Sequence, residues 1–173
     1  MMIVPVMKVD LFELTNNHVW QTEFAFRQWT FDVHPEGWDI ETDAQGWTEW
    51  GWIDFGFKTY YALLNSGYRL RPTGGTASGV HPVPLGFGRV YVHVPDEFRY
   101  EKWIAGLDAG RSFVTTGPML HTEVNGTLAS TTFRHDAHPR TYRVRGWAAG
   151  ATPLALVEIV ANGKVVRTLR TDN

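Results

Sequence analysis

The sequence contains no cysteine among its 173 residues. This absence excludes a disulfide-stabilised scaffold, a thiolate zinc site and a cysteine nucleophile. Any metal ion that binds must therefore be held by histidine and carboxylate side chains. The cellular compartment is not determined by this composition.

Long apolar runs and a strong charge of either sign are also absent. The formal net charge is −2 and the sequence pI is about 6.4, so the chain has no broad attraction for a phosphate backbone. The apolar segment from Met1 to Met7 reaches Lys8 too soon for a signal-peptide core, and no stretch approaches the roughly 20 apolar residues of a membrane span. We therefore expect a soluble chain with neither a nucleic-acid nor a membrane partner.

Aromatic residues, in contrast, are abundant. They make up 14% of the chain, with eight Trp and ten Phe, and hydrophobic residues reach 43%, enough for a real core. Four tryptophans, Trp38, Trp47, Trp50 and Trp52, fall in or beside an irregular stretch rich in Gly and Asp. They are interpreted either as a lid or stacking surface or, more simply, as a plug of the core.

The first two thirds of the chain predict a mixed α/β unit. Alternating apolar and polar residues predict strands, and helical periods that end at Gly67 and Gly110 predict helices. The expected strands cover 9–14, 69–73, 89–94 and 112–115, and the expected helices cover 54–66 and 97–109, the second led by Asp96. Because a strand, a helix and a strand follow one another after residue 89, a parallel unit is expected there.

Beyond Pro118 the pattern changes to strands without helices between them. The expected strands are 119–124, 142–147, 154–160 and 164–169. The pairs Asn125-Gly126 and Asn162-Gly163 predict two-residue hairpin turns, whose two central positions require positive φ. We therefore predict a small antiparallel β unit that packs on the α/β part or on a second chain.

Two polar loops after predicted strands each carry a histidine, His18 and His81. Ligands collect in such loops of α/β units, and neutral imidazole is a common metal ligand. Glu13, at the end of the first strand, is a third candidate ligand. The alternative is that each of these side chains is solvated, caps an element or makes an ordinary hydrogen bond, as expected for the five other histidines. Candidate substrate-binding residues in the same loops are Asn17, Gly74, Gly75, Thr76 and Ser78.

Two familiar motifs are absent from the glycine-rich loop at residues 74–82. It lacks the Gly-Lys-Ser/Thr ending of a Walker A site, so phosphate binding of that kind is excluded. Ser78 does not stand in a Gly-x-Ser-x-Gly frame, which leaves a Ser78–His81 nucleophile pair as a weak alternative.

Four segments in order resemble one family. They are NNHVW at 16–20, YYALLNSGYRL at 60–70, PTGGT at 72–76 and above all GRSFVTTGP at 110–118. Together they resemble hydrolases of the polymerase-and-histidinol-phosphatase (PHP) type, carbaryl-hydrolase-like branch, over roughly residues 9 to 126. The β unit that follows is similar to the extension found after the barrel in such proteins.

The resemblance implies a distorted βα barrel that holds two or three divalent ions, such as zinc, manganese or iron, and hydrolyses a small phosphate, carbamate or related ester. The first ligands of that family come from a His-x-His and an Asp-His pair, which this chain lacks, and Ala77 stands where an Asp is expected before His81. The fold expected from the resemblance is therefore α/β, with residues 1–118 forming a partial, truncated PHP-like βα barrel and residues 119–173 an antiparallel β appendage.

Two functions from different classes are compatible with these features. The first is the C-terminal portion of a metal-dependent hydrolase, entered within a longer reading frame and inactive or nearly so as an isolated chain. The second is a non-catalytic binding or structural module that uses the Trp-rich surface or the β appendage. In both cases an incomplete barrel leaves open strand edges, so we predict a homo-oligomer.

Overall fold

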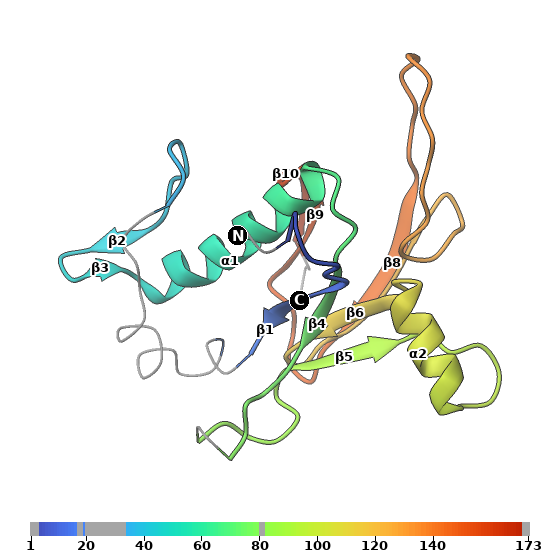
Figure 1. Cartoon of the computed structure of the whole chain (residues 1–173), viewed down its shortest axis with the longest axis horizontal. Coiled ribbons are helices and arrows are strands. Elements are labelled where there is room, and N and C mark those ends of the chain that lie inside the picture. Colours follow the sequence, from blue (N-terminus) through green and yellow to red (C-terminus); the bar gives the residue numbers. More distant parts are fainter. Residues whose placement is uncertain (1–3, 17–18, 20–33, 80–81, 171–173) are drawn as a thin grey trace.

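A computed structural model describes residues 4–16, 19, 34–79 and 82–170. Figure 1 shows a long helix on one side, a group of short strands at the centre and extended strands beyond them. The described elements are mixed α/β, with two helices and ten short strands.

The centre of the fold is a parallel pair of strands, β1 (Leu11–Thr15) and β4 (Arg71–Gly74). Phe12 lies opposite Pro72 and Glu13 opposite Thr73, and a shift in register follows Glu13. The connection between them contains helix α1 (Glu49–Asn65), which carries the chain back so that both strands run in the same direction. Their carboxyl ends therefore lie at one edge.

Helix α1 begins at Glu49, five residues before the predicted start. The Thr48 side chain accepts a hydrogen bond from the Gly51 backbone N–H at 3.1 Å and so caps the helix. The helix ends where expected, because Gly67 adopts a φ of 90° that favours glycine. Neither helix in the described part of the chain is long and apolar enough to cross a membrane.

The core lies between α1 and the parallel pair. Its buried centre is formed by Tyr60, Leu63 and Leu70, and Phe12 packs on Tyr60 with ring centroids 5.2 Å apart. The Tyr60 hydroxyl donates to the Leu70 carbonyl oxygen at 3.1 Å, which satisfies it inside the core. Burial, and after it the neighbouring Tyr61, raises the pKa of Tyr60 above its ordinary value.

Three of the four tryptophans form a plug at the start of α1, as the simpler interpretation predicts. Trp47 is 5% exposed and its ring centroid lies 4.9 Å from that of Phe55. Trp38 and Trp52 contact the same phenylalanine at 5.7 and 6.4 Å. A short hairpin of β2 (Thr42–Asp43) and β3 (Gly46–Trp47), with two pairs of facing residues, precedes α1 and contributes Trp47 to the plug. Trp50 is the exception, with 70% of its side chain exposed.

The expected parallel unit after residue 89 is wrong. Strands β5 (Arg89–Val92) and β6 (Ser112–Thr115) pair antiparallel, with Val92 opposite Ser112. Helix α2 (Tyr100–Asp108) lies between them, and Gly106 packs so closely on Val92 that an added Cβ would lie 2.5 Å from its Cγ1. The chain therefore leaves the end of β5 and α2 returns it to the same end (Figure 1). Asp96 does not cap α2: it has a φ of 62°, and the helix begins after Arg99.

The partial PHP-like βα barrel expected from the resemblance is also wrong for the described residues. A barrel requires hydrogen-bonded partners on both sides of every strand. Each described strand instead pairs on one side only, which gives five separate two-stranded sheets, four of them antiparallel. β4 packs next to β5 and β6, but this contact adds no ladder that closes a barrel.

The region after residue 118 contains strands as predicted, with a different pairing. β7 (Met119–Val124) pairs with β8 (Val144–Ala149), and β9 (Leu156–Ala161) pairs with β10 (Lys164–Arg170). Both central residues of the two predicted Asn-Gly turns have positive φ. Asn162-Gly163 closes the β9–β10 hairpin, whereas Asn125-Gly126 closes a single bridge before a long loop leads to β8. The four strands thus form two pairs rather than one sheet.

Two glycines of α1 provide a test of this packing. We expect Gly51→Ala to destabilise the fold by about 1–3 kcal/mol, because the added methyl group would overlap the Glu41 carbonyl oxygen. Gly56 has nothing within 4 Å of an added Cβ, so Gly56→Ala should stabilise the helix by about 0.5–1 kcal/mol. Urea unfolding of both variants measures the difference, and equal effects would contradict the contact between Gly51 and residue 41.

Candidate functional site

The candidate site lies at the carboxyl edge of the β1–β4 pair. Glu13 is exposed there, and its Oε2 accepts a hydrogen bond of 2.8 Å from the Asn16 side-chain amide. Its other oxygen, Oε1, lies over Gly75, where an added Cβ would be 2.7 Å away. The Gly75 N–H donates to the Thr15 carbonyl at 2.9 Å and thereby holds the two strand ends together. The Glu13 carboxylate is thus held next to the backbone of Gly75, which has no side chain of its own.

Glycines make this close approach possible. A Cβ on Gly74 would lie 2.6 Å from the Thr15 hydroxyl and 2.9 Å from the Val114 side chain, and a Cβ on Gly88 would overlap the Gly75 carbonyl. Three chain segments therefore meet around Thr15 with no side chains between them. Thr15 itself is 8% exposed, and its hydroxyl has no hydrogen-bond partner among the described residues.

Thr76 fastens the glycine-rich loop to the segment before β5. Its hydroxyl donates to the Gly88 carbonyl at 2.9 Å and accepts from the Gly88 N–H at 3.2 Å. The side chain is 8% exposed, so both bonds are shielded from water. Thr76 therefore stabilises the backbone of the site. Its hydroxyl already makes two hydrogen bonds to Gly88 and is not presented to a substrate.

The loop turns outward after Thr76. Ala77 has a φ of 46° and Gly79 a φ of 94°, both in the left-handed region, and Ser78 between them is exposed. The described residues offer Ser78 no side-chain hydrogen bond. The base predicted for it, His81, lies outside the described residues, so the Ser78–His81 nucleophile pair stays a prediction.

The predicted site residues thus divide into two groups. Glu13, Gly74, Gly75 and Thr76 lie at one edge, while Ser78 lies apart from this contact; their predicted ligand and substrate roles stay predictions. The remaining candidates, His18, His81 and Asn17, lie outside the described residues. Their predicted convergence is untested.

The described side chains that could bind a metal ion do not form a metal centre by themselves. In the described ranges no group of three or more His, Cys, Asp or Glu side chains is close enough to hold an ion. Glu13 is the one candidate ligand of the predicted set whose position is described, whereas a catalytic zinc site takes about three protein ligands. A divalent ion at this edge therefore needs further ligands in addition to Glu13.

Sequence reasoning missed three residues that shape the site. Asn16, three residues after Glu13, orients the carboxylate; a polar amide at this spacing after a strand-end acid was the available signal. The burial of Thr15 and the role of Gly88 depend on segments far apart in the chain, and no local pattern indicated them.

Comparisons with protein-family models, with curated proteins and with solved structures gave no match for this chain. Function therefore has to be inferred from the site residues themselves and from the motifs quoted above.

The two buried threonines of the site allow a matched test. Thr15→Val replaces an unpartnered hydroxyl by a methyl group, and we expect it to raise the free energy of unfolding by about 1 kcal/mol. Thr76→Val removes two hydrogen bonds and leaves the Gly88 N–H and carbonyl unpaired, so a loss of about 2 kcal/mol is expected. Thermal and urea unfolding compare the two, and equal losses would show that the Thr15 hydroxyl has a partner after all.

Proposed function

We propose that this chain contributes to the site of a metal-dependent hydrolase that acts on a small phosphate or carbamate ester. The observation that carries the proposal is the Glu13 carboxylate, held by Asn16 over the open backbone of Gly75 at the carboxyl edge of two parallel strands. Ligands of α/β units bind at such edges. His18 follows β1 and His81 follows the loop after β4, and we propose both as further ligands.

Each described residue has a distinct part in this proposal. Asn16 occupies one carboxylate oxygen of Glu13 and so limits the directions in which the other oxygen points. Gly75 leaves room beside that oxygen, and Thr76 fixes the backbone behind it. A bound divalent ion would lower the pKa of water and stabilise negative charge on the ester.

The number of ligands limits the expected activity. Glu13, His18 and His81 are enough for one ion at most, while two-ion hydrolytic centres require more groups. We therefore propose that turnover by this chain alone is weak or absent, and that additional ligands come from another segment or a second subunit.

Metal binding tests the role of Glu13. We expect Glu13→Gln to weaken binding of Mn²⁺ or Zn²⁺ by about tenfold or more, because it removes the negative charge but keeps the shape and the contact with Asn16. Isothermal titration measures the affinity, and assays with aryl phosphates and carbamates measure turnover. Glu101→Gln, an exposed acid on α2, is the control and should leave the affinity unchanged. Equal affinity of the Glu13 variant and the unmodified chain would exclude this carboxylate as a ligand.

Ala77 offers a gain-of-function test, since the family that this chain resembles implies an Asp at this position. Asn and Asp both tolerate the left-handed backbone that Ala77 adopts, but only Asp adds a charge. We expect Ala77→Asp to bind Mn²⁺ or Zn²⁺ about tenfold more tightly than Ala77→Asn. Equal metal affinities for the two variants, measured by titration, would argue against a ligand position at residue 77.

The alternative function is a binding module that uses the Trp-rich surface or the β appendage, and Trp147 on β8 of that appendage is 56% exposed. Trp38, Trp47 and Trp52 are engaged with Phe55 in the plug. Trp50 is the exposed member of this group, and it lines a groove along α1. Within this group of tryptophans, an interaction role therefore depends on Trp50 and that groove.

A further inference from the structure

A groove of about 700 Å³ lies between α1 and the β9–β10 hairpin, away from the Glu13 edge. Its helical wall is a single stripe of α1, because Trp50, Ile53, Phe57 and Tyr61 follow one another at intervals of three or four residues. The stripe adjoins the face with Tyr60 and Leu63 that packs into the core, and Tyr61 at its carboxyl end also packs against that core. Helix α1 thus has two neighbouring apolar faces.

The hairpin supplies the second wall. Val160 on β9 lies opposite Val165 on β10, and these two side chains are 38% and 51% exposed toward the groove. The hairpin turn closes one end, where an added Cβ on Gly163 would lie 3.2 Å from the Tyr61 Cβ. In Figure 1 the hairpin lies behind the carboxyl-terminal part of α1. Apolar side chains on both walls are therefore left in contact with water.

The groove is also acidic. Asp39, Glu41, Asp54 and Glu158 line it together with one cation, Lys58, which leaves a net charge of −3. Lys58 is already bound to the Asp54 carboxylate and the Asp39 carbonyl. Burial, and after it the carboxylates of Asp54 and Glu158, raise the pKa of Tyr61, so the negative potential reaches the aromatic wall. Such a surface favours a ligand that is both cationic and able to stack on rings.

A segment of the same chain, which we call the arginine-rich loop although its last two residues begin strand β8, has the opposite properties. Residues 133–145 contain Arg134, Arg140, Arg143 and Arg145 against the single acid Asp136, for a net charge of +3 with neutral histidines. Phe133 and Tyr142 lie in the same loop, with ring centroids 5.2 Å apart. No ion pair joins Arg134, Arg143 or Arg145 to a carboxylate within the described ranges. Three arginines are thus open to an acidic partner.

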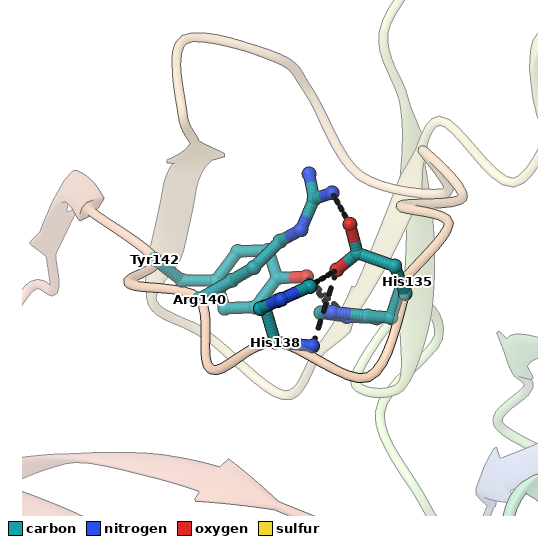
Figure 2. A network of polar contacts seen from close by, with 5 residues as sticks. His135, His138, Arg140 and Tyr142 are labelled. Atoms are coloured by element: carbon teal, nitrogen blue, oxygen red, sulfur yellow. Dashed lines mark hydrogen bonds and ion pairs between the residues drawn. The ribbon is translucent and has the colours of Figure 1, made fainter.

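The loop is held in shape by its own polar contacts, shown in Figure 2. Asp136 pairs with Arg140 at 3.3 Å and with His138 at 3.5 Å, and Tyr142 contacts His135. Residues 133–145 contribute nothing to the lining of the groove in their own chain. A preformed loop loses little conformational entropy when it binds elsewhere.

We propose that the acidic aromatic groove of one chain binds the arginine-rich loop 133–145 of a second copy. The opposite charges and the aromatic residues of both surfaces match, and arginine both stacks on aromatic rings and pairs with carboxylates. A second copy would also cover the apolar side chains on both walls of the groove. The proposal is independent of the hydrolase function.

A charge exchange between the two surfaces tests the contact. We expect the unmodified chain to self-associate in the micromolar range, and Glu158→Arg or Arg134→Glu to raise the dissociation constant by about tenfold or more. The chain that carries both substitutions should regain most of the affinity, because the new charges again have opposite signs. Sedimentation velocity measures the mass at several concentrations and salt levels, and circular dichroism checks the fold of each variant.

Arg167→Glu is the matched control, since Arg167 lies opposite Ile159 in the hairpin and does not line the groove. It should leave self-association unchanged. A native chain that sediments as a monomer throughout would overturn the proposal. So would an assembly that Arg167→Glu weakens as much as Glu158→Arg, or one that the double exchange fails to restore.

Discussion

Close backbone packing around Thr15 is the constraint on which the centre of this structure depends. Gly88 approaches the Gly75 carbonyl, and Gly74 approaches the Thr15 and Val114 side chains, more closely than an added Cβ would permit without a shift. The packing buries the Thr15 and Thr76 hydroxyls and places the Glu13 carboxylate at an open edge. A larger residue at Gly88 would push the Gly75 backbone away, and one at Gly75 would displace the Glu13 carboxylate itself. Site geometry and fold stability therefore share the same contacts.

The sequence predicted local elements well because their signals are local. Strand β6 begins and ends at the predicted residues, and the Asn162-Gly163 hairpin has the predicted positive φ values. The partners of the strands were predicted poorly, since the direction in which β6 pairs with β5 depends on the path of the chain around α2. Among the site residues, Glu13 was named as a candidate ligand and Gly75 as a candidate substrate-binding residue of a separate loop, whereas the contribution of Gly88 required knowledge of the tertiary fold.

The groove was missed for a different physical reason. The predicted helix began at Asp54, so Trp50 was assigned to an irregular stretch and the stripe from Trp50 to Tyr61 was not recognised. The Thr48 cap that extends the helix is a common signal, but the glycines that follow it, Gly51 and Gly56, are poor helix formers and obscured it. Packing of Gly51 against the backbone of Glu41 offsets that low propensity.

Helix α1 couples the folding of the chain to its association with a partner. One of its faces forms the core with Tyr60 and Leu63, and the adjoining face lines the groove with Trp50 and Tyr61, of which Tyr61 also packs against the core. A partner that occupies the groove binds only the folded helix, so its binding free energy adds to the stability of the core that the same helix forms. The melting temperature of an associating chain would then rise with its concentration. Abundance in the cell would thus determine both how much of the chain is assembled and how much of it remains folded.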